Sequence, residues 1–155
     1  MTPVESIRIM AGLLAVAVFL GVLLIPAIFY ILTLSKALNK CSPATRTMQP
    51  GSLWLLLIPI FNLIWHFLVV SAMAQSLGNE FRARGVMNAE PEPGKSPGMA
   101  MCICGACGLI PILGILASLA SLVLWIMYWV KIAEFSRQLD AVRYMGAAPT
   151  IAPGL

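Results

Sequence analysis

Charged residues divide the chain into long apolar runs and short polar connections. Asp, Glu, Lys and Arg are absent from residues 9–35, 47–79 and 96–130. Each run is longer than the roughly 20 residues that a helix needs to cross about 30 Å of hydrocarbon. A helix of a water-soluble protein would interrupt such a run with a charged face. The pattern therefore predicts an integral membrane protein built from helices.

Turn-forming residues between the apolar runs predict the order of the helices. Pro50-Gly51 is a turn signal before the second run, and the segment 82–96 combines Gly and Pro with alternating charges, as a solvent-exposed loop does. We expect a single transmembrane domain at 1–145 and a flexible tail at 146–155. The expected helices are 7–38, 52–81, 97–111 and 114–141.

The third apolar run, residues 96–130, has two possible arrangements. As one straight helix it would measure about 52 Å, which is too long for one crossing and barely enough for two. Pro and Gly interrupt it at 111–114. If the chain turns there, seven of the ten basic residues share one side of the membrane, as cytoplasmic segments prefer, and only Lys36, Lys40 and Arg46 lie on the other side. We favour this arrangement, with both termini cytoplasmic, although 97–111 can also be a short or re-entrant element.

The expected fold is an all-α membrane bundle of about four helices, three of them long. Aromatic and basic residues near the helix ends predict contact with the membrane interface. Small residues at helical spacing predict close packing, either within the chain or against a partner. The expected interfacial residues are Tyr30, Trp54, Trp125, Tyr128, Trp129 and Lys131. The expected packing residues are Gly12, Gly114, Ala117, Ser118 and Ser121.

Composition agrees with this interpretation and limits the partners. Hydrophobic residues make up 60% of the chain and charged residues 10%, against about 25% charged in soluble domains. The net charge of +4 is too small and too scattered for a nucleic-acid surface. It suits anionic lipid headgroups. We expect the lipid bilayer as a partner, together with other membrane subunits or further copies of the chain, and no nucleic acid.

Asn62 and His66 are polar residues inside the second apolar run. They are four residues apart, so on a helix they share a face. An ionisable group at membrane depth suggests a proton or ligand role. The alternative is a structural hydrogen bond to a neighbouring helix. We favour the structural role, because the run offers no charged residue at comparable depth to complete a proton relay.

A group of sulfur-containing residues occupies the third run, with Cys102, Cys104 and Cys107 next to two methionines. Thiolates and thioethers bind soft metals. On a helix, however, only Cys104 and Cys107 share a face. Cysteine is also a common small apolar residue in protein cores. We favour packing, predict no metal and no cofactor, and keep a metal or redox site as an alternative.

The tetrapeptide Leu-Ile-Pro-Ile occurs twice, at 57–60 and 109–112, each time before a long apolar segment. Paired proline interruptions in matching positions can mark a transporter that is built from repeats. Four residues carry little information, and coincidence is the simpler explanation.

Several short segments resemble a family of small, uncharacterised multi-pass membrane proteins of the bacterial inner membrane. The resemblance covers most of the chain outside the loop after Arg82 and the tail. It implies a bacterial inner-membrane location and about four helices, and it brings no activity, cofactor or catalytic residue. The segments are Ser42-Pro43-x-x-Arg46-Thr47-Met48-x-Pro50-Gly51, Trp54-Leu-Leu-Leu-Ile-Pro59-Ile-Phe-Asn62-Leu-Ile-Trp65, Ser76-Leu77-x-Asn79-Glu80-Phe81 and Tyr128-Trp129-Val-Lys131-Ile-Ala133-Glu134.

Two classes of function follow from these features. The first is a structural or accessory subunit that packs into a larger membrane assembly. The second is a minimal transporter, channel or sensor that uses Asn62 and His66. We do not expect an enzyme, because the sequence offers no nucleophile–base pair, paired carboxylates or metal-ligand spacing.

Overall fold

The computed structural model describes residues 2–86, 90–110 and 114–146, and this part of the chain contains helices and no strand. Three helices are long and two are short. In chain order they are α1 (Pro3–Lys40), the 3-10 helix η1 (Pro50–Leu57), α2 (Pro59–Ala83), α3 (Lys95–Cys107) and α4 (Gly114–Gly146).

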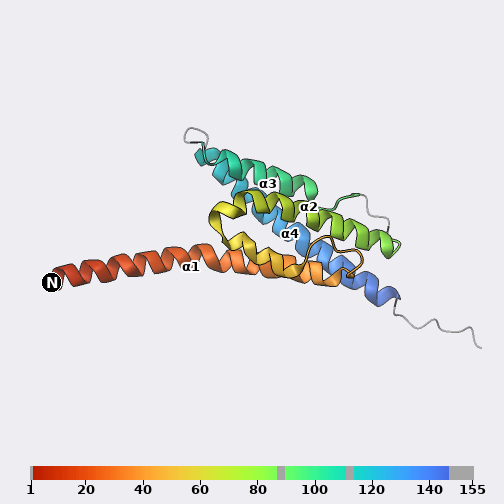
Figure 1. The fold of residues 1–155 in the computed structure, drawn as a ribbon, viewed down its shortest axis with the longest axis horizontal. Helices are drawn as coiled ribbons and strands as arrows, with labels where there is room; N and C mark the ends of the chain where they lie inside the picture. Colours follow the sequence, from red (N-terminus) through yellow and green to blue (C-terminus); the bar gives the residue numbers. More distant parts are fainter. Residues whose placement is uncertain (1, 87–89, 111–113, 147–155) are drawn as a thin grey trace, which may run out of the picture.

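The three long helices run in the same direction, and the short elements carry the chain back between them (Figure 1). The C-terminal ends of the long helices meet. Lys40 at the end of α1 pairs with Asp140 of α4 at 2.6 Å. Arg84, just after α2, donates to the carbonyl oxygen of Lys40. The chain therefore forms two hairpins, η1–α2 and α3–α4, beside α1.

The predicted helix 52–81 is wrong, because the chain breaks at Ile58. Ile58 has an extended conformation, with φ −86° and ψ 107°, and α2 begins at Pro59. A proline inside a helix loses one backbone hydrogen bond, and its ring clashes with the carbonyl four residues earlier. It also disfavours helical geometry in the residue before it, whereas the first position of a helix tolerates it.

The other helix boundaries differ from the expected ones by a few residues. α1 begins at Pro3 because the Thr2 and Glu5 side chains form a capping box. α3 begins at Lys95, directly after Gly94, whose φ is +78°. α4 continues to Gly146, five residues past the predicted end. The predicted turn at 111–114 lies mostly outside the described residues, as does the predicted tail beyond 146.

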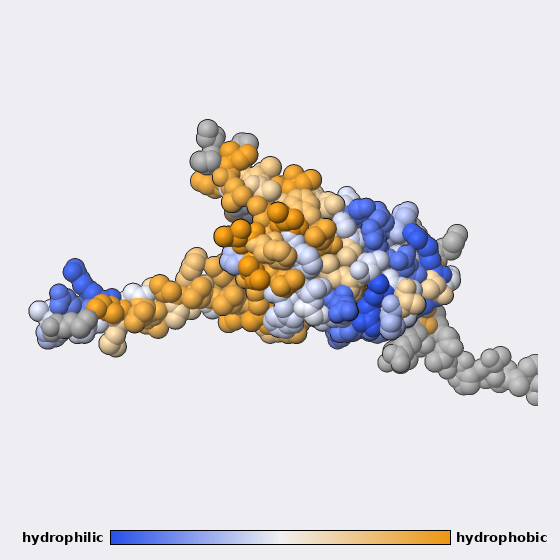
Figure 2. Space-filling model, in the orientation of Figure 1, coloured by the Kyte–Doolittle hydropathy of each residue, from blue (hydrophilic) through white to orange (hydrophobic). Residues whose placement is uncertain are grey.

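The expected separation of basic residues between two faces is also wrong. Lys40 was expected on the face opposite to the end of α4, yet it pairs with Asp140 there. Arg46 lies in the loop between α1 and η1, which is bonded to the C-terminal half of α2 through Thr47 and Ser76. Except for Arg8, the basic residues gather toward one end of the molecule (Figures 1 and 2). α1 begins at the other end (Figure 1).

The core lies where the long helices cross, and small residues set how closely they approach. A Cβ on Gly98 of α3 would lie 2.5 Å from Val70 of α2 and 2.8 Å from the ring of Tyr128 of α4. Ser121 and Ser118 of α4 lie against α3, 3.3 Å and 3.0 Å from the Cβ positions of Gly105 and Gly108. Ser118 and Ser121, two of the packing residues expected on α4, thus lie on the α3–α4 contact. The fully buried large side chains are Tyr128, Phe81, Ile31, Leu34, Leu38, Leu53, Met73, Leu77, Ile132, Leu139, Val69 and Val70.

Apolar side chains also cover much of the outer surface. α1, α2 and α4 are long and apolar enough to cross a membrane. Residues 3–20 of α1 are all exposed, and that half of the helix extends beyond the bundle (Figures 1 and 2). Gly12, an expected packing residue, has nothing within 4 Å of its Cβ position. The packed half of α1 begins near Pro26.

Candidate functional site

Asn62 and His66 lie in the first turns of α2 and face two cavities. The first cavity, of about 390 Å³, lies between α2, α3 and α4. The second, of about 270 Å³, lies between α2, α1 and η1. Trp125 of α4 also lines both. The first cavity is lined by Pro59, Asn62, Leu63, His66, Met101, Cys102, Gly105, Ser118, Ser121, Leu122 and Trp125.

The polar atoms at these cavities differ in how well they are bonded. His66 Nε2 lies 2.9 Å from the hydroxyl oxygen of Tyr30 on α1. Asn62 Oδ1 is buried and has no hydrogen-bond partner in the described part of the chain. Neither cavity is lined by Asp, Glu, Lys or Arg. The arrangement suits a neutral molecule that donates a hydrogen bond.

Four of the aromatic residues expected at the membrane interface form one cluster, in which Tyr30 and Tyr128 are buried and Trp125 and Trp129 are half-buried. Tyr30 is 3% exposed, and its ring centroid lies 5.2 Å from that of Trp125 and 6.4 Å from that of Tyr128. Tyr128 is fully buried, so the interfacial role predicted for the two tyrosines is wrong. Trp129 Nε1 donates to Thr33 Oγ1 at 2.8 Å. Only Trp54, which is 44% exposed, is largely uncovered.

Lys131 of α4 forms an ion pair with the loop that precedes α3. Its ammonium group lies 2.6 Å from a Glu90 oxygen. The other Glu90 oxygen accepts from the Gly94 backbone at 3.0 Å. The hydrogen bond from Lys131, together with that from the Gly94 backbone, holds the pKa of Glu90 below its usual value. The predicted interfacial lysine thus joins α4 to the α2–α3 loop.

The cysteine cluster does not assemble a metal site in the part of the chain that the structure describes. No group of three or more His, Cys, Asp or Glu residues there is placed to hold an ion. Cys102 is buried and lines the cavity that His66 also lines. Cys104 and Cys107 are partly exposed and free.

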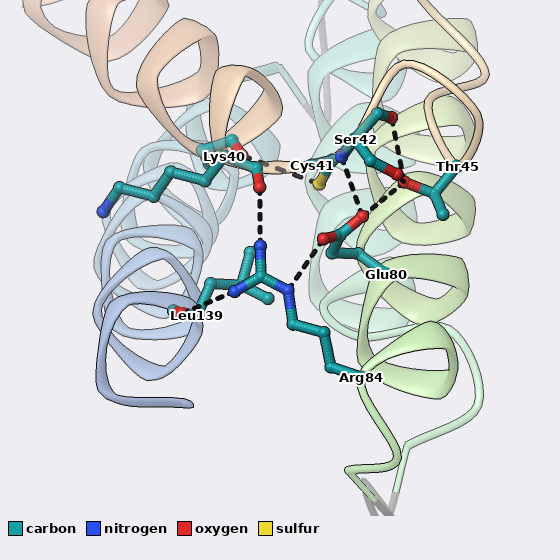
Figure 3. Close-up of polar contacts among 8 residues, drawn as sticks. Lys40, Cys41, Ser42, Thr45, Glu80, Arg84 and Leu139 are labelled. Atoms are coloured by element: carbon teal, nitrogen blue, oxygen red, sulfur yellow. Dashed lines mark hydrogen bonds and ion pairs between the residues drawn. The ribbon is translucent and has the colours of Figure 1, made fainter. Parts of the chain in front are cut away.

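A second polar cluster, which the sequence analysis did not identify, lies at the charged end of the bundle (Figure 3). Its centre is Glu80, which is 4% exposed. Arg84 Nε donates to one Glu80 oxygen at 2.7 Å. The backbone nitrogen of Ser42 donates to the other at 2.8 Å, and the Thr45 hydroxyl donates to it too. The carboxylate therefore joins α2 to the loop after α1.

Arg84 extends this cluster to the ends of α1 and α4. One terminal nitrogen donates to the Leu139 carbonyl at 2.7 Å, and the other donates to the Lys40 carbonyl at 2.9 Å (Figure 3). The planar, five-donor guanidinium makes these three bonds at once, each from a different nitrogen. We call Lys40, Ser42, Thr45, Glu80 and Arg84 the polar clamp.

Cys41 lies beside the polar clamp and is buried. Burial, together with the nearby Glu80 carboxylate, raises the pKa of its thiol to about 11. The nucleophile and metal ligand is the thiolate, which is scarce at neutral pH when the pKa is this high. Cys41 belongs to the hydrophobic core, at 1% exposed.

A third cavity, of about 540 Å³, lies at the same end of the molecule, between the loop after α1 and the start of η1. Arg46 lines it, and Arg46 Nε is buried with no hydrogen-bond partner among the described residues. The complete lining is Pro43, Arg46, Thr47, Met48, Gln49, Pro50 and Gly51.

Comparison with known proteins gave no match. No family model, no curated protein and no solved structure matches the chain. Any statement about its function therefore rests on the sequence and on the geometry above.

Proposed function

We propose that this chain is an integral membrane protein that serves as an accessory subunit, with α1 crossing the bilayer and packing against a helix of a partner subunit. The observation that carries the proposal is the free half of α1. Residues 3–20 are exposed along their whole length, although they are almost entirely apolar. Large exposed apolar surfaces mark membrane or protein contacts.

The charge distribution supports one orientation. Nine of the ten basic residues lie toward the end where the polar clamp is, and only Arg8 lies at the start of α1. Basic residues accumulate on the cytoplasmic side. The proposed orientation therefore has the polar clamp and the end of α4 in the cytoplasm and the start of α1 on the opposite side. It replaces the expectation that both termini are cytoplasmic.

The shortness of the returning arms, η1 with eight residues and α3 with 13, supports a partial insertion of the two hairpins. The charge-free part of α1, residues 9–35, spans about 40 Å, whereas the part of α4 at 114–130 spans about 25 Å. The tips of the two hairpins carry exposed apolar side chains, among them Ile60, which is 91% exposed, and Leu109, which is 70% exposed. In this arrangement η1–α2 and α3–α4 enter from the cytoplasmic side and end within the hydrocarbon, as re-entrant elements.

The small residues of α1 indicate the face for lateral packing. Gly12 and Ala15 are three residues apart and share a face, on which another helix can approach closely. Both are exposed. Ala17 lies on the opposite face of the helix and is also exposed.

We expect Gly12→Leu combined with Ala15→Leu to weaken assembly about tenfold, which corresponds to about 1.4 kcal/mol. Bulky side chains on that face keep the partner helix at a distance. Ala17→Leu should leave assembly unchanged. The measurement is the size distribution of the complex extracted in mild detergent, with its subunits identified by cross-linking in the native membrane. A wild-type chain that is monomeric in the membrane, or equal losses in both variants, would contradict the proposal.

A second candidate function is a sensor or carrier of a neutral, membrane-soluble molecule. The observation that favours it is the buried Asn62 Oδ1, which lines both inner cavities without a partner. A buried acceptor without a donor costs about 1–3 kcal/mol, and a ligand that donates a hydrogen bond would recover that cost.

A further inference from the structure

We propose that the cavity at Arg46 binds a phosphate group, and that the phosphate belongs to the headgroup of an anionic phospholipid. The first reason is the guanidinium itself. Arg46 Nε is buried without a partner, and no carboxylate in the described part of the chain forms an ion pair with Arg46. The cavity of about 540 Å³ that it lines contains no acidic residue. A planar guanidinium binds phosphate oxygens with paired hydrogen bonds.

The backbone around Arg46 is held in place before any ligand binds. The Thr45 carbonyl accepts from Asn79 Nδ2 at 3.4 Å, and the Thr45 hydroxyl donates to Glu80. On the other side, the Thr47 nitrogen donates to Ser76 Oγ at 3.0 Å. Both neighbours of Arg46 are thus fixed to α2. A site whose backbone is already ordered loses less conformational entropy when it binds a ligand.

The start of η1 adds a second favourable feature for an anion. Gln49, Pro50 and Gly51 line the cavity, and η1 is an eight-residue helix that begins there. The Gln49 side chain makes no capping hydrogen bond at this helix start. Pro50 has no N–H and the Ser52 nitrogen donates to the Gln49 carbonyl at 3.1 Å, so in this first turn Gly51 offers its backbone N–H to a ligand. The positive end of the helix also attracts anions.

The position of the cavity favours a lipid over a soluble anion. Arg46 is the last charged residue before the apolar run 47–79, and the half-exposed Trp54 follows in η1. Figure 2 shows this charged end adjoining the apolar surface of the bundle. In the proposed orientation, the cavity lies on the cytoplasmic side, at the level of the headgroups, where anionic lipids attract basic residues.

The test uses the purified full chain in neutral detergent, titrated with phosphatidylglycerol, with phosphatidylcholine and with inorganic phosphate. Bound lipid is counted by native mass spectrometry. We expect one saturable phosphatidylglycerol site, a binding constant at least tenfold weaker in Arg46→Gln, and an intermediate loss in Arg46→Lys. Arg137→Gln removes the same charge from an exposed part of α4 and should bind as the wild type does.

The other outcomes overturn the proposal. Equal binding of phosphatidylglycerol by Arg46→Gln and by the wild type would show that Arg46 does not belong to the binding site. Equal binding of phosphatidylcholine would mean that the anionic headgroup is not recognised. Binding of inorganic phosphate that depends on Arg46, without binding of phosphatidylglycerol, would assign the cavity to a soluble anion. No described residue forms a hydrogen bond or ion pair with the Arg46 side chain, so all variants should keep the thermal stability of the wild type, which the same samples report.

Discussion

Replacing Glu80 with alanine should lower the free energy of unfolding by about 3 kcal/mol. Removing one member of a buried ion pair leaves the other charge without compensation, which costs about 3–5 kcal/mol. The Arg84 side chain keeps some contact with solvent, at 22% exposed, so the lower end of that range applies. Ser42 and Thr45 would lose their acceptor as well. Titration of the chain in mixed micelles with a denaturing detergent measures the change.

Glu92→Ala is the matched control for this prediction. Glu92 also pairs with a basic residue, Lys95 at 2.6 Å, but the two side chains are 40% and 35% exposed. Exposed pairs contribute about 0–1 kcal/mol. Arg84→Lys keeps the charge and loses the three-way fork, so it should fall between the two. If Glu80→Ala and Glu92→Ala destabilise the chain equally, the polar clamp does not hold the helix ends together.

Replacing Tyr30 with phenylalanine should cost about 1–1.5 kcal/mol, because His66 Nε2 loses its hydrogen-bond partner at 2.9 Å. Tyr128→Phe changes the same kind of side chain in the same aromatic cluster. The Tyr128 hydroxyl is buried and has no partner among the described residues, so its removal should leave stability unchanged or raise it slightly. The same micelle titration measures both variants.

The different results expected for Tyr30→Phe and Tyr128→Phe make the test specific. A loss of similar size in both would mean that the cluster responds to the shape of the ring and not to the Tyr30–His66 bond. A neutral Tyr30→Phe would show that His66 finds another partner, for example at the cavities that it lines.

The apolar runs predicted the long helices. They did not predict the direction in which the chain runs between those helices. The absence of charged residues from 47–79 led to the prediction of one crossing there. This criterion depends on composition and not on backbone geometry. The break at Ile58 depends on a single proline, and transmembrane helices can also tolerate proline as a kink. The repeated Leu-Ile-Pro-Ile was an available signal. Its first copy lies where η1 turns into α2, and Leu109 and Ile110 of the second follow α3 after Gly108.

The candidate site was predicted in part. The spacing of Asn62 and His66 placed them on one face, and both line the same cavities. The hydrogen bond between Tyr30 and His66 depends on how α1 and α2 cross. The spacing of residues within one helix carries no information about that crossing. The polar clamp had a visible signal, since Glu80 and Arg84 are four residues apart at the end of an apolar run. The bonds from Arg84 to the carbonyl oxygens of Lys40 and Leu139 require the parallel arrangement of the long helices.

The central claim is the arrangement in the membrane: α1 crosses once, and both hairpins enter from the side where α1 ends. Cysteine labelling from each side of sealed vesicles tests it most directly, in a chain whose four native cysteines are replaced. We predict that Ala44→Cys, Ser96→Cys and Gln138→Cys react with an impermeant thiol reagent from the cytoplasmic side only. Ser6→Cys should react from the other side, and Leu109→Cys only after the membrane is dissolved. Labelling of Ala44→Cys from the side opposite to Ser96→Cys would contradict the account.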